Sequence, residues 1–192
     1  MDIIIKKLTP GLAKDYLEFF DHTPHSTGKD EHRCYCVCWA STKGEPDVCR
    51  TADARRQLAE RYIKNQHIQG YLAYSGERVI GWCNANTKSD CRESIAWSMF
   101  MKGIKAEERK TKSVFCFAVA PEFRRKGIAS MLLEKVCEDA KAEGFDCVEA
   151  YPNTNYINDE QDYMGAVKMY ERLGFSEAYR IEGKTVMIKR LA

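Results

Sequence analysis

The chain has 192 residues, of which 44% are hydrophobic and 30% charged, and its formal net charge is +2. This composition is ordinary for a soluble globular protein, and the small net charge gives no reason to expect a nucleic-acid partner. No apolar run approaches the roughly 20 residues of a membrane helix, and the N-terminal sequence does not resemble a signal peptide. The nine cysteines are an odd number in a chain without a signal, which favours free thiols in a reducing cytoplasm. We therefore expect a single cytoplasmic domain over residues 1–192, without a membrane partner.

The hydrophobic pattern predicts strands and helices that follow one another along the whole chain. Thr51 is expected to cap the second helix, and Gly144 to end the third long one. The order of these elements predicts an α/β fold with a single mixed sheet. Strands are expected at 3–7, 69–74, 78–85, 113–119, 146–151, 175–180 and 185–189, and helices at 12–20, 53–66, near 95–100, 126–143 and 163–173.

Residues 114–129 combine an apolar strand, a proline turn, three consecutive cations and the start of a long helix. Gly127 allows the backbone to approach a ligand closely. The first N–H groups of the helix have no partner within the helix, and with Arg124, Arg125 and Lys126 they suit a pyrophosphate. The alternative to a pyrophosphate site, if the three charges are considered alone, is a solvated basic turn before a surface helix.

Two motifs in this half of the chain resemble those of the GNAT acetyltransferase family. Residues 124–129 match its Arg/Gln-x-x-Gly-x-Gly/Ala motif, and residues 117–121 match the strand and turn before it. Residues 166–175 are similar to the last helix of the family, with its tyrosine and its Gly-Phe ending. The resemblance implies a GNAT-type fold, with one mixed, mostly antiparallel sheet of about six or seven strands flanked by helices. It also implies an N-acetyltransferase that uses acetyl-CoA as co-substrate and needs no metal.

The resemblance also implies a role for particular residues. Tyr170 matches the general acid of the family, because a phenol with a pKa of about 10 can protonate a leaving thiolate. The alternative is that Tyr170 only packs against the sheet. A backbone N–H of the strand would serve as an oxyanion donor. The implied carrier-binding residues are Phe117, Ala118 and Val119 for the pantetheine arm and Arg124, Arg125, Lys126, Gly127, Ile128, Ala129 and Ser130 for the pyrophosphate.

Two positions depart from the pattern of the family. Some members carry a glutamate on the strand before the phosphate loop, but residues 112–115 hold no carboxylate here. Glu149 on the next strand is the nearest candidate for the base, where partial burial would raise its pKa, and the alternative role of Glu149 is that of a structural or surface carboxylate. Carboxylates of the 152–162 loop acting through water, or an amine that arrives neutral, are the alternatives. The asparagine that often precedes the helical tyrosine is replaced by Tyr163, and its substitutes would be Asn153, Asn155 or Asn158.

Three cysteines, Cys34, Cys36 and Cys38, stand at alternate positions in the N-terminal half. In an extended segment this spacing places all three sulfur atoms on one face. We expect the segment to form a wall of the acceptor pocket, in which Tyr35 and Trp39 contact a cationic amine. A zinc site and redox-active thiols are the alternatives, with further ligands to zinc from His22, His25, His32 or Cys49.

The expected reaction is direct transfer of an acetyl group from acetyl-CoA to a primary amine of a small molecule or a protein. Two alternatives remain at this stage: a non-catalytic acyl-CoA-binding regulatory module, and a metal- or redox-responsive protein built on the 34–38 segment. The sequence does not identify the acceptor, and it leaves the oligomeric state open, with a homodimer as one option.

Overall fold

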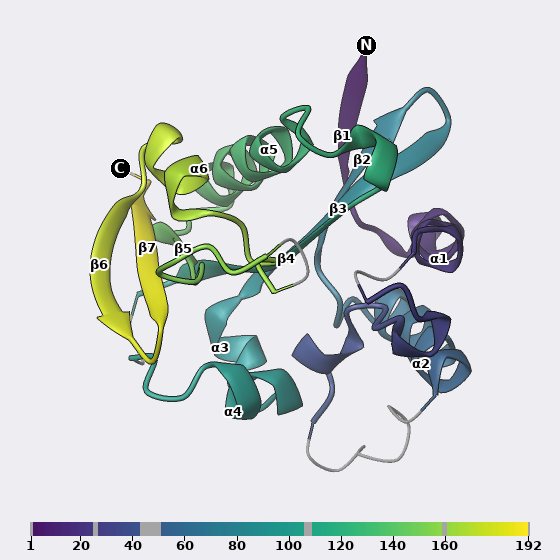
Figure 1. The fold of residues 1–192 in the computed structure, drawn as a ribbon, viewed down its shortest axis with the longest axis horizontal. Coiled ribbons are helices and arrows are strands. Elements are labelled where there is room, and N and C mark those ends of the chain that lie inside the picture. Colours follow the sequence, from purple (N-terminus) through teal and green to yellow (C-terminus); the bar gives the residue numbers. More distant parts are fainter. Residues whose placement is uncertain (1, 25–26, 43–50, 106–108, 159–160, 192) are drawn as a thin grey trace.

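The central element of the computed structural model is a seven-stranded sheet (Figure 1). The structure describes residues 2–24, 27–42, 51–105, 109–158 and 161–191. Within this part of the chain, β4 and β5 form the one parallel pair, and all other neighbours are antiparallel. The sheet order is β1 (Ile3–Lys7), β2 (Gly70–Ser75), β3 (Arg78–Thr87), β4 (Thr111–Val119), β5 (Cys147–Ala150), β7 (Lys184–Arg190) and β6 (Ser176–Ile181). The predicted mixed, mostly antiparallel sheet is confirmed.

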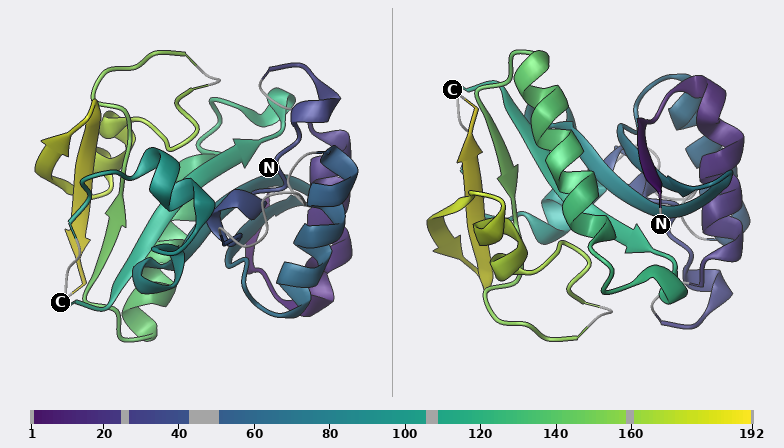
Figure 2. Two further views of the ribbon diagram at one scale, coloured as in Figure 1. Left: turned by 90° about the horizontal axis from the view of Figure 1, so that it is seen from below. Right: turned by 90° about the horizontal axis from the view of Figure 1, so that it is seen from above.

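Helices cover both faces of the sheet, and the two opposite views of Figure 2 each show one of these layers. The longest helix, α5, crosses one face, and α6 lies beside it. The other face carries the remaining helices and the 3-10 turn Val37–Trp39. The helices are α1 (Ala13–His22), α2 (Ala52–Lys64), α3 (Lys88–Cys91), α4 (Ile95–Phe100), α5 (Ile128–Ala142) and α6 (Val167–Arg172), and the 3-10 turns include Val37–Trp39 and Pro121–Phe123.

Strand alternation divides the core into two apolar layers. Leu72 and Trp82 pack on the α1 side, whereas Ala73 and Cys83 pack against α5. Gly81 of β3 lies directly under the start of α5, where an added Cβ would come within 2.9 Å of an Ile128 methyl carbon. This glycine therefore lets the first turn of α5 lie close against the sheet.

The helix ends follow local chemistry. The Thr51 side chain accepts a hydrogen bond from the Ala54 N–H at 3.1 Å, which confirms the predicted cap of α2. The last helix begins at Val167, so the prediction that it starts at residue 163 is wrong. Gly165 has φ +85°, and Ala166 is extended with φ −96° and ψ 143°, and these conformations interrupt the helix. The short helix α3 was not predicted.

A β-bulge changes the direction of side chains in β4. Asn84 pairs with Cys116 and Ala85 with Val114, which leaves Phe115 without a partner residue on β3. The bulge places Phe115 and Cys116 on the same face of the sheet, toward α1 and α2. Phe117 then returns to the face covered by α5.

The cysteine segment is not extended, so that prediction is wrong. Tyr35 and Cys36 have left-handed φ angles of 45° and 53°, and the 3-10 turn Val37–Trp39 follows them. The cause is tertiary: the Tyr16 hydroxyl donates to the Tyr35 carbonyl oxygen at 2.7 Å, which fixes the bend against α1. His25 and Cys49 lie outside the described residues.

Candidate active site

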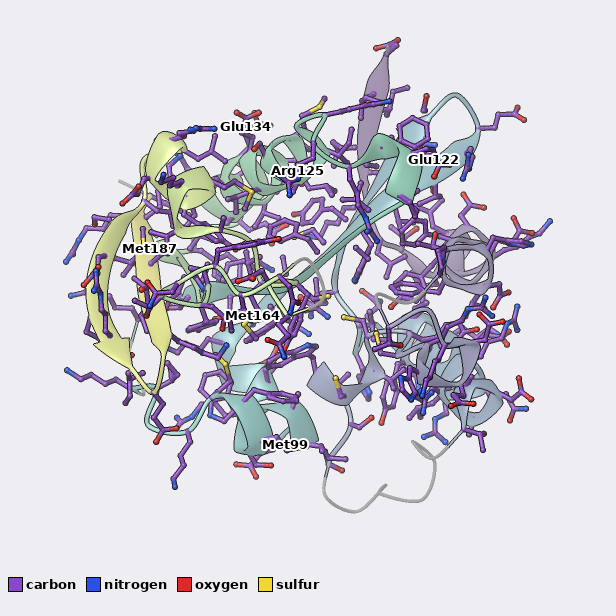
Figure 3. All side chains as sticks on the ribbon, in the orientation of Figure 1. Met99, Glu122, Arg125, Glu134, Met164 and Met187 are labelled. Atoms are coloured by element: carbon purple, nitrogen blue, oxygen red, sulfur yellow. The ribbon has the colours of Figure 1, made fainter. Side chains whose placement is uncertain are left out.

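The end of β4 and the start of α5 bring the expected carrier-binding residues together (Figure 1). Residues 117–119 close the strand, and residues 124–130 form the loop and the first helical turn. Arg125 and Gly127 have φ +61° and +81°, and Gly127 is the N-cap residue of α5. No side chain caps this helix end, so its first N–H groups remain open to an anion. Figure 3 labels Arg125 next to this helix end.

All three loop cations are exposed, which suits a ligand that arrives from solvent. Lys126 Nζ lies 5.4 Å from the centre of the Phe123 ring, and Arg124 Nε donates to the Val119 carbonyl oxygen at 3.2 Å. The cations and the N-terminus of a 15-residue helix give this end a positive field. Such a site favours a phosphate group.

Beyond Val114, β4 has an open edge on the side of β5. The two strands pair only from Thr111 to Val114, and β4 continues to Val119. The Ala120 N–H bonds to β3 through the Ile80 carbonyl oxygen at 2.9 Å. By alternation, the backbone groups of Phe117 and Val119 point away from β3 and toward the open edge.

The open edge is partly occupied by the chain before α6. The Phe117 N–H donates to the Tyr163 carbonyl oxygen at 2.7 Å. Of the three candidate asparagines, Asn153 and Asn158 bond within their own loop, both to the Asp162 carboxylate. An extended ligand along β4 would therefore replace the Tyr163 carbonyl group.

Tyr170 lies on α6 and is fully buried in the layer under α5. Its hydroxyl donates to the Met164 carbonyl oxygen at 2.6 Å, and its ring meets Phe175 edge-on at 5.2 Å between ring centres. Burial raises the pKa of Tyr170 well above its usual value, so the phenol keeps its proton at neutral pH. At Gly165, with φ +85°, an added Cβ would lie 3.2 Å from the Tyr170 oxygen.

Glu149 lies on β5 directly opposite Ser113 of β4, on the face away from α5. Its carboxylate accepts a hydrogen bond from Lys88 Nζ at 2.6 Å, and the two side chains are 1% and 5% exposed. The Tyr151 hydroxyl bonds to Ser113 Oγ at 2.7 Å and also interacts with Glu149. Burial, and then the Glu149 charge, raise the pKa of Tyr151 well above its usual value. Lys88 is not among the predicted site residues, because the hydrophobic pattern does not predict the short helix α3 that carries it.

Aromatic side chains fill the space next to this polar cluster. Trp39 stacks on Phe115 at 4.3 Å between ring centres, and Phe115 stacks on Tyr151 at 5.7 Å. Tyr35 and Trp39 are each only 3% exposed. The expectation that these two rings line an acceptor pocket is not met, because both are part of the core.

In the described part of the chain, no group of three or more histidine, cysteine or acidic side chains is arranged to hold a metal ion. None of the described helices has both the length and the apolar character needed to cross a membrane.

The family model that describes the acetyltransferase (GNAT) family matches residues 15–175. The chain belongs to this family. It therefore shares the fold of a family of acetyltransferases, as the two sequence motifs indicated. A curated relative, an uncharacterized N-acetyltransferase of Methanocaldococcus jannaschii, is 33% identical over 85 residues. That match covers 44% of this chain and 34% of the relative, so the match spans about a third of the relative's length.

Solved GNAT structures share the whole fold at low sequence identity. An N-acetyltransferase from Staphylococcus aureus Mu50 has a TM-score of 0.56 at 16% identity, over 100% of both chains. The PaiA N-acetyltransferase from Thermoplasma acidophilum, solved in complex with coenzyme A, has a TM-score of 0.54 at 16% identity over 99% of each chain. YncA from Salmonella typhimurium, solved with its cofactor acetyl-CoA, has a TM-score of 0.52 at 15% identity over 99% of this chain and 94% of its own. At these identities the likeness establishes the fold.

Proposed function

We propose that this protein transfers an acetyl group directly from acetyl-CoA to a primary amine of a small molecule or a protein. The observation that carries the proposal is the uncapped N-terminus of α5, with its three exposed cations, at the end of an open strand edge. Coenzyme A and acetyl-CoA are the ligands of two solved relatives with this fold. In this protein residues 124–130 would hold the pyrophosphate, and residues 117–119 the pantetheine arm.

The strand would contribute to the chemistry through a backbone group. When the carrier lies along β4, the Phe117 N–H exchanges the Tyr163 carbonyl oxygen for an oxygen of the carrier. A donor aimed at the thioester oxygen stabilises the negative charge that forms there as the amine attacks. The carbon–sulfur bond then breaks, and the thiolate of coenzyme A leaves.

Two side chains would move the protons. Tyr170 keeps its phenolic proton and would give it to the departing sulfur. Glu149 is the proposed base for the acceptor amine. On β5 it lies opposite Ser113, which belongs to the stretch of β4 where some family members carry their glutamate. The Tyr151 hydroxyl interacts with both Ser113 and Glu149. The Lys88 ammonium group compensates the charge of Glu149 in this buried position.

Acetyl-CoA should raise the melting temperature of the protein. A ligand at 100 times its dissociation constant adds about 2.7 kcal/mol to the free energy of unfolding, which corresponds to roughly 5–10 °C for a chain of this size. Differential scanning fluorimetry measures the shift. Acetyl-pantetheine, which lacks the pyrophosphate, is the matched control and should give a much smaller shift. The absence of a shift at millimolar acetyl-CoA would contradict the assignment of the carrier.

Turnover is measured as release of the coenzyme A thiol in the presence of a library of primary amines. Tyr170→Phe should bind acetyl-CoA as the wild type does and lower kcat by about a factor of 100, the lower range for loss of a general acid. Its melting temperature should fall slightly, because the Met164 carbonyl oxygen loses its donor. If kcat is unchanged, Tyr170 has a packing role only. If acetyl-CoA binds but no amine releases thiol, the protein is a regulatory binding module.

A further inference from the structure

The sulfur atom of Cys36 lies among hydrogen-bond donors in the interior of the protein. Asn84 Nδ2 donates to it at 3.3 Å, and the Cys116 side chain on the neighbouring strand interacts with it. The Trp82 indole N–H also approaches this sulfur and has no other acceptor among the described residues. Cys36 is 1% exposed, and Trp82 and Asn84 are fully buried. Several donors around one buried sulfur stabilise the thiolate over the thiol.

The backbone at Cys36 is held in a conformation that costs energy. Tyr35 and Cys36 are consecutive non-glycine residues with positive φ, a conformation that L-residues rarely adopt. A hydrogen-bonded clamp keeps it in place. Tyr16 donates to the Tyr35 carbonyl oxygen at 2.7 Å, and the Tyr35 hydroxyl donates to Asp21 Oδ1 at 2.8 Å. Arg56 in turn holds Asp21 through contacts of 2.9 to 3.1 Å. The clamp places the Cys36 sulfur against β3 and β4.

The bulge in β4 supplies the partner sulfur. Cys116 pairs with Asn84 across the sheet, and the bulge at Phe115 puts the Cys116 side chain on the face that meets Cys36. The Cys116 hydrogen bond lowers the pKa of Cys36 although burial opposes it, and the same hydrogen bond raises the pKa of Cys116 well above its usual value. One sulfur is therefore suited to be a thiolate and the other to be its proton donor. Cys116 is partly exposed, so it is the member of the pair nearer to solvent.

We propose that Cys36 and Cys116 form a peroxide-oxidisable dithiol site that closes to a disulfide between the segment before α2 and strand β4. The Cys36 thiolate attacks an oxygen of hydrogen peroxide, the O–O bond breaks, and the hydroxide that leaves is protonated to water. The Cys116 sulfur then attacks the sulfur of the Cys36 sulfenic acid. The S–S bond forms, the S–O bond breaks, and a second water leaves with the Cys116 proton. Two thiols lose two electrons in total, and the peroxide is reduced to two waters.

The neighbouring cysteines are less suited to this chemistry. The Cys34 sulfur accepts a hydrogen bond from the Cys36 N–H at 3.4 Å, and burial raises the pKa of the Cys34 thiol to about 11. Cys83 lies on β3 but faces the α5 layer, on the opposite side of the sheet. Cys116 lies in the same apolar layer as Cys36, and it pairs across the sheet with Asn84, whose side chain donates to the Cys36 sulfur. We therefore expect the Cys36–Cys116 disulfide to form in preference to other cysteine pairs. Cys116 directly precedes Phe117, whose N–H belongs to the proposed carrier strand.

The experiment treats the fully reduced, desalted protein with a few equivalents of hydrogen peroxide. We expect a mass loss of about 2 Da, the two hydrogens of one disulfide, and reversal by dithiothreitol. A non-reducing digest of the wild-type protein should contain a peptide pair that joins Cys36 to Cys116. Cys36→Ser and Cys116→Ser should each abolish the mass loss. Cys38→Ser, in the same segment, should keep it. The digest of the wild type decides the question even if a variant does not fold.

A link between any other two cysteines, such as Cys34 to Cys36, would overturn the proposal. Addition of oxygen at Cys36 without closure would overturn it as well, and so would no reaction at all. Each of these results concerns the cysteine pair alone and does not test the binding of acetyl-CoA.

Discussion

Gly127→Glu should abolish the melting-temperature shift that acetyl-CoA causes. Gly127 has φ +81°, and a Cβ at this position meets no atom within 4 Å, so the β-carbon of the glutamate meets no steric block. The left-handed backbone would cost about 1–2 kcal/mol of stability in the absence of ligand. The new carboxylate would stand at the helix N-terminus, where it cancels the positive field and repels the pyrophosphate. Isothermal titration calorimetry should detect no binding at concentrations that saturate the wild type.

The matched control is Gly144→Glu at the opposite end of α5. Gly144 also has a positive φ, +70°, and open space around an added Cβ. This variant therefore carries the same backbone strain and the same added charge, far from the proposed phosphate site. It should melt at a lower temperature than the wild type and still respond fully to acetyl-CoA. Equal loss of the response in both variants would mean that strain, rather than the phosphate site, explains the result.

Lys88→Met should lower the free energy of unfolding by about 3–5 kcal/mol, the usual cost of leaving a buried charge without its partner. The Lys88–Glu149 contact is 2.6 Å long, and Glu149 is only 1% exposed, so water cannot replace the ammonium group without rearrangement. Urea denaturation measures the change. Of the substitutions that we propose, this one has the largest expected effect on stability.

The double variant Lys88→Met/Glu149→Gln should recover most of that loss, because it removes both charges from the buried site. A double-mutant cycle gives the coupling energy between the two side chains. Additive effects of the two substitutions would show that the pair is not coupled. The same protein tests the proposed base: if its kcat with the best amine equals that of the wild type, Glu149 does not deprotonate the acceptor.

The conformation of the loop before α5, the proposed site of the carrier, could be predicted from the sequence because its parts are contiguous. The cations, Gly127 and the start of α5 follow one another within a few residues, so local chemistry determines their geometry. The Lys88–Glu149 pair joins positions 61 residues apart, and the Phe117–Tyr163 contact joins two separate elements. Such contacts depend on strand register and on how the chain returns to the sheet, which periodicity alone does not encode.

The same distinction holds for the fold. Thr51 caps α2 through a local hydrogen bond, and the strand Ile3–Lys7 has the predicted bounds. The alternating pattern of the cysteine segment is typical of a strand, yet bonds from Tyr16 and to Asp21 hold it in a left-handed bend. In the same way, β7 lies between β5 and β6, and this order depends on how all the strands assemble and not on the local sequence of β7.

The hydrogen bond from the Phe117 N–H to the Tyr163 carbonyl oxygen has a consequence for ligand affinity. A carrier that pairs with β4 competes with a segment of the protein that is tethered and always present. The apparent dissociation constant is then the intrinsic one divided by the fraction of molecules in which this segment has moved aside. Substitutions that weaken the hold of the segment on β4 would tighten binding without touching the carrier. Affinity for the co-substrate would thus be adjustable at residues that never contact it.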